Sequence, residues 1–288
     1  MPVLDRPLHS VAMTKQRPTV AIVGAGAMGE ALAHGLLGGG WKAGEVVLVA
    51  RREQRAAEVS KATGLDCGLD VAAAVAGRDV VVVAVKPNDV PAVLPELGDA
   101  VHPGNIVVSL AAGVPTTVYE ALLPGVAVVR AMPNTPARIA EGVTAVAAGR
   151  SADEAALDVA TRVLGAVGPT IVLDEHLMDA VTAVSGTGPA YVFLLAEALV
   201  DAAIREGIPA YAAEMLVEQT IRGAGMLLSS VDLTPERLRA QVTSPGGTTA
   251  AAVHLLEERG FRALVEDAVR AASLRAKEMG SRVSGSDS

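Results

Sequence analysis

Short apolar runs alternate with longer alanine-rich segments along the chain from Thr19 onward. The runs are dominated by valine and isoleucine, which is typical of strands in a parallel sheet that is covered by helices on both faces. The segments between them are long enough to form crossover helices. The pattern predicts strands at residues 19–23, 46–50, 80–85, 106–110 and 127–131, with weaker candidates at 144–148 and 170–173.

Beyond Asp174 the strand pattern disappears, and the remaining residues indicate helices separated by glycine and proline. The first long helix is expected at 189–206, because it begins at a proline and ends in an Arg-Glu-Gly-Ile-Pro stop signal. We therefore expect an α/β domain followed by an all-helical one. The expected divisions are a poorly ordered arm at 1–17, a sheet domain at 18–174 and a helical domain at 175–288, with further helices at 210–228, 250–258 and 261–279.

Length and charge narrow the classes of partner. A chain of 288 residues favours two domains over one. The net charge is −8 and the lysines are scattered singly, so there is no basic stripe for nucleic acid or an anionic membrane. The longest uncharged run, residues 180–196, contains glycine and proline and is shorter than the ~20 apolar residues of a membrane span. We expect neither a nucleic-acid nor a membrane partner.

Cys67 is the only cysteine, which excludes an internal disulfide and a cysteine-based zinc cluster. Asp66, Asp70 and Asp79 do not form a spaced ligand set, so no metal is expected. A lone cysteine and the lack of a continuous apolar segment at the start favour a cytoplasmic location. The translation start is left open between Met1 and Met13.

A glycine-rich turn lies between the first predicted strand and the first predicted helix. It has the form Gly-Ala-Gly-Ala-Met-Gly. The first glycine permits the tight turn, the second lets the backbone approach a pyrophosphate, and the third lets the helix pack on the strand. Unpaired N–H groups at the helix start favour phosphate binding. The sequence therefore predicts a dinucleotide site at Gly24, Gly26, Ala27, Met28 and Gly29.

The second predicted strand ends at Ala50-Arg51-Arg52, where an NAD site usually has an acidic residue that binds the ribose hydroxyls. Two guanidinium groups suit a 2′-phosphate instead, because their planar donors match its oxygens. Arg51 and Arg52 therefore favour NADPH over NADH. The alternative is that both arginines are solvated residues of a first helical turn, next to Glu53.

A second candidate anion site precedes the predicted helix at 250–258. Ser244-Pro245-Gly246-Gly247-Thr248-Thr249 would leave backbone N–H groups pointing outward at the helix start. Ser185 begins another glycine-rich segment, Ser-Gly-Thr-Gly-Pro, which predicts a second helix start that could lie across from the first. Two such starts favour a pocket for a carboxylate. The alternative is a capped helix that binds nothing.

Several stretches taken together resemble the pyrroline-5-carboxylate reductase family, in order from about Thr19 to Met279. The Ser-Pro-Gly-Gly-Thr-Thr segment is a highly specific marker of that family. The others are Ala84-Val85-Lys86-Pro87, Ser109-Leu110-Ala111-Ala112-Gly113, Arg130-Ala131-Met132-Pro133-Asn134-Thr135-Pro136 and Ser185-Gly186-Thr187-Gly188-Pro189-Ala190-Tyr191.

The resemblance implies a Rossmann-like domain, a helical dimerisation domain and the reduction of 1-pyrroline-5-carboxylate to proline. It implies that the substrate carboxylate lies on backbone donors of Ser244, Gly246, Gly247 and Thr248, with the Thr249 hydroxyl near the ring nitrogen. One departure is Val71, where the family often has an asparagine that reaches the adenine ribose. The residues implied at the nicotinamide end of the cofactor are Ala84, Val85, Lys86, Pro87, Ala111, Ala112 and Gly113.

The missing residues also favour imine reduction. A hydroxy-acid dehydrogenase needs a proton-transferring side chain, and the related β-hydroxyacid dehydrogenases use a lysine on the helix that corresponds to residues 189–206. This chain has no lysine between Lys86 and Lys277. A protonated imine is already electrophilic, so catalysis would depend mainly on orientation, with Thr249 as the one catalytic side chain.

We therefore expect an NAD(P)H-dependent reductase that acts on a small carboxylated imine and assembles as a homodimer at least. A higher oligomer of dimers is left open. Two other functions also stay open: a related NADP-linked imine or deazaflavin reductase of the same architecture, and a nucleotide-binding protein without turnover.

Overall fold

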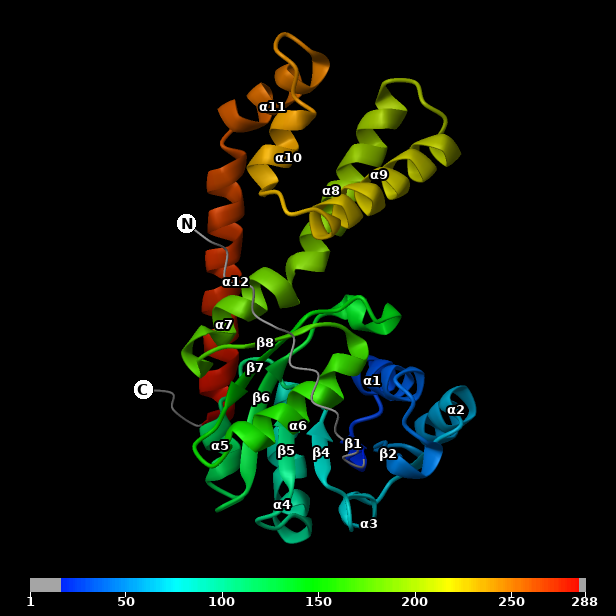
Figure 1. Ribbon diagram of the computed structural model, residues 1–288, viewed down its shortest axis with the longest axis vertical. Helices are drawn as coiled ribbons and strands as arrows, with labels where there is room; N and C mark the ends of the chain where they lie inside the picture. Colours follow the sequence, from blue (N-terminus) through cyan, green and yellow to red (C-terminus); the bar gives the residue numbers. More distant parts are fainter. Residues whose placement is uncertain (1–16, 285–288) are drawn as a thin grey trace.

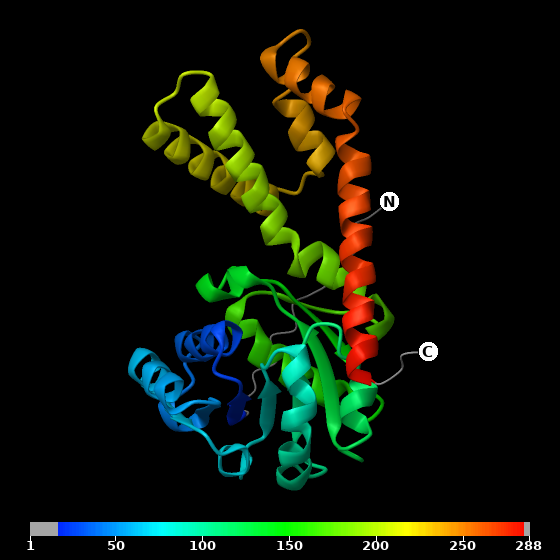
Figure 2. The same ribbon diagram turned by 180° about the vertical axis from the view of Figure 1, so that it is seen from behind.

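The computed structural model describes residues 17–284. The predicted N-terminal arm lies outside the described residues except for Arg17, as do both candidate start methionines. Figure 1 shows a sheet domain with helices on both faces and an elongated helical arm extending from it. The last helix runs from the arm back to the sheet domain, and Figure 2 shows the same arrangement from behind.

Eight strands form one sheet in the order β3-β2-β1-β4-β5-β6-β7-β8. β7 pairs antiparallel with β6 and parallel with β8, so these two strands run opposite to the other six. All seven predicted strands are confirmed, with ends within two residues of those expected. The strands are β1 Val20–Val23, β2 Val46–Val49, β3 Asp66–Gly68, β4 Val80–Val83, β5 Ile106–Ser109, β6 Ala127–Met132, β7 Thr144–Ala148 and β8 Thr170–Val172.

The sheet separates two apolar cores, and alternate residues of each strand enter opposite cores. Ile22 belongs to the core that α1, α2 and α6 cover, while Val23 belongs to the core under α3, α4 and α5. Burial on both faces explains why the strands are almost entirely apolar. The helices of this domain are α1 Ala27–Gly38, α2 Glu53–Thr63, α3 Val71–Val75, α4 Val90–Ala100, α5 Thr116–Glu120 and α6 Glu154–Leu164.

The strand order changes direction at β1, because β2 lies on one side of it and β4 on the other. In open parallel sheets, ligands bind beside the carboxyl ends of the strands at such a switch point. The turns that follow β1, β4 and β5 leave neighbouring strands at this same edge. The fold therefore brings three of the predicted cofactor segments to one edge of the sheet.

The helical arm is built from the expected long helices and several short ones. Helix α10, which the sequence pattern had not indicated, is capped by the Thr234 hydroxyl. The helices are α7 Met178–Val181, α8 Gly188–Arg205, α9 Ala210–Ser230, α10 Pro235–Gln241, α11 Thr248–Glu258 and α12 Phe261–Ser284.

An ionic network around the buried Arg130 joins the base of the arm to the sheet. The Arg130 side chain on β6 is 6% exposed and its Nη2 lies 2.9 Å from Oδ1 of Asp179 on α7. Glu175 lies 3.7 Å from Arg130 and accepts hydrogen bonds from both the backbone N–H and the hydroxyl of Thr116. Loss of one member would leave a buried charge without its partner, which typically costs about 3–5 kcal/mol. The network therefore fixes where the arm leaves the sheet.

The arm leaves a large apolar surface uncovered. Helices α8 and α11 bury none of their residues, and α9 buries only Ala213 and Val217. Phe193 is 61% exposed and Leu194 66% exposed. The helical run from Glu175 to Arg205 has the length and composition of a membrane span, and only 6% of its most apolar window is buried in the single chain. An exposed apolar face of this size indicates an interaction surface.

Candidate functional site

The glycine-rich turn joins β1 to α1, and each of its three glycines has a different environment. Gly24 has φ +115°, and a Cβ there would lie 2.7 Å from the Ala84 carbonyl. A Cβ on Gly29 would lie 2.1 Å from the Gly24 oxygen. A Cβ on Gly26 would meet nothing within 4 Å. Backbone atoms therefore leave no room for a side chain at Gly24 or Gly29, whereas the space beside Gly26 is open. That space fits the close approach of a pyrophosphate to the backbone.

Backbone hydrogen bonds hold this turn against the neighbouring strand. The N–H groups of Gly24 and Ala25 both donate to the Val49 carbonyl, at 2.9 and 3.0 Å. Helix α1 starts at Ala27 with Gly26 as its N-cap and no side-chain cap. Its first N–H groups, including those of Ala27 and Met28, are therefore available to a phosphate.

The two arginines at the end of β2 lie on the surface. Arg51 is 81% exposed, and its Nη1 lies 3.3 Å from Oδ1 of Asp89. Arg52 is exposed at the N-cap of α2. An exposed ion pair of this kind contributes little to stability, so the Arg51 guanidinium can exchange Asp89 for another anion.

Arg55, one turn farther along α2, was not predicted to take part. Its Nε donates to the Ala25 carbonyl at 2.7 Å, and its Nη2 lies 2.5 Å from Oε2 of Glu30. The Glu30 carboxylate raises the pKa of Arg55. The sequence could have indicated this role, because Arg55 lies three residues after Arg52 and residues three apart are neighbours on one face of a helix.

The segment after β4 lies directly against the glycine-rich turn, since a Cβ on Gly24 would lie 2.7 Å from the Ala84 carbonyl and 2.9 Å from the Val85 nitrogen. Lys86 is exposed and precedes Pro87, the first residue of a short 3-10 helix. The structure therefore brings the predicted residues Ala84, Val85, Lys86 and Pro87 next to the predicted dinucleotide turn.

The segment after β5 is held from two sides. The Ser109 hydroxyl donates to the Tyr119 hydroxyl oxygen at 2.7 Å and accepts from the Ala111 N–H at 3.3 Å. Burial raises the pKa of Tyr119 to about 12, so this phenol is neutral at physiological pH. Gly113 has φ +78°, and a Cβ there would lie 2.7 Å from the Ala276 carbonyl of α12. Ala111, Ala112 and Gly113 thus form a fixed turn between the sheet and the last helix.

The helix start predicted in the Ser185–Pro189 segment is present, since α8 begins at Gly188 with a proline in its first turn, but the helix is continuous with the preceding turn and has no exposed tip there. Residues Thr182–Gly186 form a π-helical turn that continues α7 and leads through Thr187 into α8. The Ser185 hydroxyl lies 3.4 Å from the amide nitrogen of Asn134, in the segment that follows β6. The glycines therefore allow a tight turn against Met132 rather than a helix tip, because a Cβ on Gly186 would lie 2.4 Å from the Met132 methyl. Turns of this type are frequent at functional sites.

The second predicted helix start is present. Gly247 is the N-cap of α11, with no side-chain cap, and Gly246 has φ +70°. The turn is tight, since the Gly247 N–H donates to the Ser244 carbonyl at 3.0 Å. Ser244 and Thr248 are exposed and Thr249 is half-buried. The free N–H groups at the start of α11 can therefore donate hydrogen bonds to an anion such as a carboxylate.

The two predicted halves of the site are far apart within one chain. Figure 1 places α11 at the far end of the arm from β1 and α1, and the view from behind gives the same separation. A single chain therefore does not bring the Gly24–Gly29 turn and Thr249 together.

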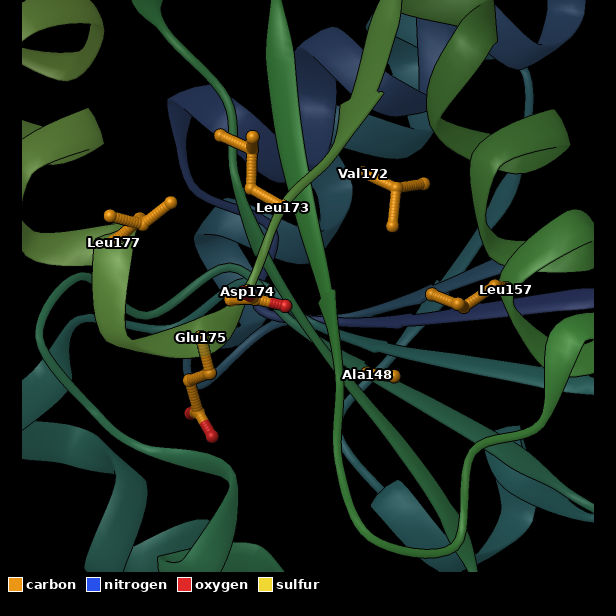
Figure 3. Close-up of a pocket in the computed structure, with 7 residues that line it drawn as sticks. All are labelled: Ala148, Leu157, Val172, Leu173, Asp174, Glu175 and Leu177. Carbon is orange, nitrogen blue, oxygen red and sulfur yellow. The ribbon is translucent and has the colours of Figure 1, made fainter.

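One pocket of about 460 Å³ lies beside the edge strand β8. Figure 3 shows the side chains of Leu157 and Val172 on one side of the strand and that of Leu177 on the other. Its polar lining residues are Asp174 and Glu175, and no cationic side chain lines it. Two carboxylates disfavour an anionic ligand, so this pocket does not fit a phosphate or a carboxylated substrate.

In the described part of the chain, no group of three or more His, Cys, Asp or Glu side chains could hold a metal ion.

Comparison with known proteins gives matches to both domains. A family model described as pyrroline-5-carboxylate reductase dimerisation matches residues 175–279. Residues 19–113 match a model described as NADP oxidoreductase, coenzyme F420-dependent. Pyrroline-5-carboxylate reductase of Mycobacterium tuberculosis strain H37Rv is 42% identical in an alignment that covers 90% of this chain and 96% of that protein.

Solved structures agree with these matches. The structure of a pyrroline-5-carboxylate reductase from Coxiella burnetii aligns with a TM-score of 0.86 and 35% identity, over 92% of this chain and 99% of the other. The Plasmodium falciparum pyrroline carboxylate reductase with NADP bound aligns with a TM-score of 0.81 and 29% identity, over 91% and 98% of the two chains.

Proposed function

The chain belongs to the pyrroline-5-carboxylate reductase family and reduces 1-pyrroline-5-carboxylate to L-proline with NAD(P)H, and we propose which of its residues carry out each part of that reaction. The observation that carries the proposal is the glycine-rich turn, in which backbone closes over Gly24 and Gly29 while the space beside Gly26 stays open. The test is NADPH oxidation by the purified protein with and without pyrroline-5-carboxylate. Oxidation that is no faster with this compound than without it would contradict the proposed substrate.

The sheet domain, residues 18–174, holds the dinucleotide. The N–H groups of Gly26, Ala27 and Met28 bind its pyrophosphate at the start of α1. The turns at Ala84–Pro87 and Ala111–Gly113 lie beside the nicotinamide, which supplies the hydride when it is bound. Their task is orientation: the contacts around Gly24 and Gly113 fix both turns relative to the sheet before any ligand arrives.

The helical domain, residues 175–288, holds the substrate. The carboxylate lies on the N–H groups of Ser244, Gly246 and Thr248 at the start of α11, where the helix dipole favours a negative charge. Pro245 has no N–H, and the Gly247 N–H donates to the Ser244 carbonyl and closes the turn. The Thr249 hydroxyl lies near the ring nitrogen and can hold a proton there. Ser185, in the π-helical turn, provides a further hydroxyl to the pocket.

A second copy of the chain completes the site. The two halves lie at opposite ends of one chain, while the arm carries an uncovered apolar face that a second arm can cover. In a two-fold dimer the same surface of each copy forms the interface, so α11 of one subunit can lie over the nucleotide turn of the other. The assembly is then a homodimer at least. A lone cysteine also favours a cytoplasmic location.

Arg51 and Arg52 bind the 2′-phosphate of NADPH. Replacing both by alanine is expected to weaken NADPH binding roughly 30-fold, or about 2 kcal/mol, because charge-assisted hydrogen bonds to the phosphate are lost. NADH lacks this group, so its binding should be almost unchanged. Dissociation constants of both dinucleotides from titration calorimetry check the prediction. An equal loss for NADH would exclude a contact with the 2′-phosphate.

Thr249→Ala is expected to lower kcat by about 100-fold, the lower range for loss of a proton-transferring group. The KM for NADPH should stay close to that of the wild type, because Thr249 lies in the substrate half. Thr249→Ser keeps the hydroxyl and should retain most of the rate. Steady-state kinetics on the three proteins measure both constants, and an unchanged kcat in Thr249→Ala would remove Thr249 from the mechanism.

A further inference from the structure

We propose that Arg55 is a positioning residue for dinucleotide binding: it holds the Ala25 carbonyl and thereby aims the Gly26 N–H at the cofactor pyrophosphate. The inference rests on the proposed function, since it assumes a dinucleotide at the Gly24–Gly29 turn. It adds a residue that lies outside the glycine motif and touches no predicted ligand.

The geometry of one peptide bond carries the argument. The Arg55 Nε lies 2.7 Å from the Ala25 oxygen, so that carbonyl points toward α2. In a trans peptide the carbonyl and the following N–H point in opposite directions, and no cis peptide is found in residues 17–284. The Gly26 N–H therefore points away from Arg55. No acceptor within the described residues takes this N–H, and the space beside Gly26 is open.

The same guanidinium also controls a charge next to the phosphate position. Glu30 lies in the first turn of α1, where a free carboxylate would repel a pyrophosphate. Its Oε2 is paired with Arg55 Nη2 at 2.5 Å, and both side chains are about two-thirds buried or more. The planar guanidinium reaches the carbonyl through Nε and the carboxylate through Nη2 at once. A lysine ammonium on its flexible stem lacks this fixed fork.

Arg55 is placed to act on the pyrophosphate turn and not on the 2′-phosphate. Its donors are already committed to Ala25, Glu30 and Glu58, the last at 3.6 Å. Arg51 and Arg52, by contrast, are exposed at the end of β2. The pyrophosphate is common to NADH and NADPH. Loss of Arg55 should therefore weaken both dinucleotides by the same factor.

The experiment compares Arg55→Ala, Arg55→Lys and the double variant Glu30→Ala/Arg55→Ala in the full chain. Titration calorimetry with NADPH and with NADH gives the dissociation constants, and thermal unfolding without ligand gives the stability. Lys61→Ala is the matched control, because it removes one positive charge from the exposed far end of the same helix. We expect Arg55→Ala to raise both dissociation constants about tenfold, with Lys61→Ala unchanged.

Two further results are expected if the carbonyl contact is the cause. Arg55→Lys should recover only part of the affinity, and removing Glu30 as well should not restore it. A loss confined to NADPH would overturn the proposal in favour of a direct contact with the 2′-phosphate. If the double variant bound as tightly as the wild type, the role of Arg55 would be only to neutralise the charge of Glu30. If Arg55→Ala lowered the melting temperature without changing the dissociation constants, its role would be only in stability. Binding of NADPH by the wild type tests the proposed dinucleotide site separately, because Arg55 can position the turn only if the turn binds a dinucleotide.

Discussion

Gly26→Ala is expected to leave the stability of the ligand-free protein unchanged and to weaken dinucleotide binding about 100-fold, or roughly 2.7 kcal/mol. The new methyl group meets no protein atom within 4 Å, and φ at this position is −80°, which alanine adopts without strain. The methyl group would instead occupy the space where the pyrophosphate approaches the backbone. The free energy of dinucleotide binding should therefore become less favourable, while the free energy of unfolding of the ligand-free protein stays the same.

Gly29→Ala is the matched variant in the same turn, and it should give the opposite result. Its Cβ would lie 2.1 Å from the Gly24 carbonyl oxygen and 3.2 Å from the Ile22 side chain. The first contact is with backbone that the hydrogen bonds to Val49 already hold, so the strand and helix must move apart. We expect a loss of roughly 2–4 kcal/mol in the free energy of unfolding.

Chemical denaturation of the two ligand-free variants, followed by calorimetric titration with NADPH, checks both expectations. Gly44→Ala serves as a control, because a Cβ there also meets nothing within 4 Å and the residue lies outside the turn. If Gly26→Ala bound NADPH as tightly as the wild type, the pyrophosphate would not approach Gly26, and the proposed orientation of the cofactor would be wrong.

The sheet domain could be predicted almost completely from the sequence, because strands buried on both faces require unbroken apolar runs. The strand β3 was missed since it has only three residues, and Asp66 and Gly68 in it are exposed. Helix α10 could have been found. Its Thr-Pro-Glu start combines an N-cap, a first-turn proline and an acidic residue.

The candidate site was predicted unevenly, and the reasons are physical. The glycine turn follows local rules of strand, turn and helix, so its motif was sufficient to predict the conformation between β1 and α1. The Ser185 segment was predicted in part. Helix α8 does begin at Gly188, but glycine also permits the tight π-helical turn before it, and only the packing against Met132 selects that turn. Arg130 was not predicted to form an ion pair with the helical domain, although a charged residue in a buried strand requires a partner of opposite charge. The spacing of motifs along one chain also does not say which subunits meet at a site.

Co-expression of two impaired variants is expected to restore activity if, as we propose, each site combines segments of two subunits. Gly26→Ala impairs the nucleotide half and Thr249→Ala the substrate half, each to about 1% of the wild-type rate at subsaturating NADPH. A heterodimer of the two contains one site with both halves intact and one with both altered. Random assembly from equal amounts makes half of the dimers mixed, so roughly a quarter of all sites should be intact.

Equal co-expression of the two variants, followed by a rate measurement at fixed total protein, distinguishes the two arrangements. If each site were built within one chain, every site in the mixture would carry one altered half, and the rate would stay near the mean of the separate variants. The control is co-expression of the wild type with the double variant Gly26→Ala/Thr249→Ala. In that mixture a shared site should be intact in only about a quarter of cases, whereas a site within one chain would be intact in about half. The two mixtures therefore give equal rates for a shared site and very different rates for a site within one chain, which makes their ratio independent of the turnover number of the enzyme.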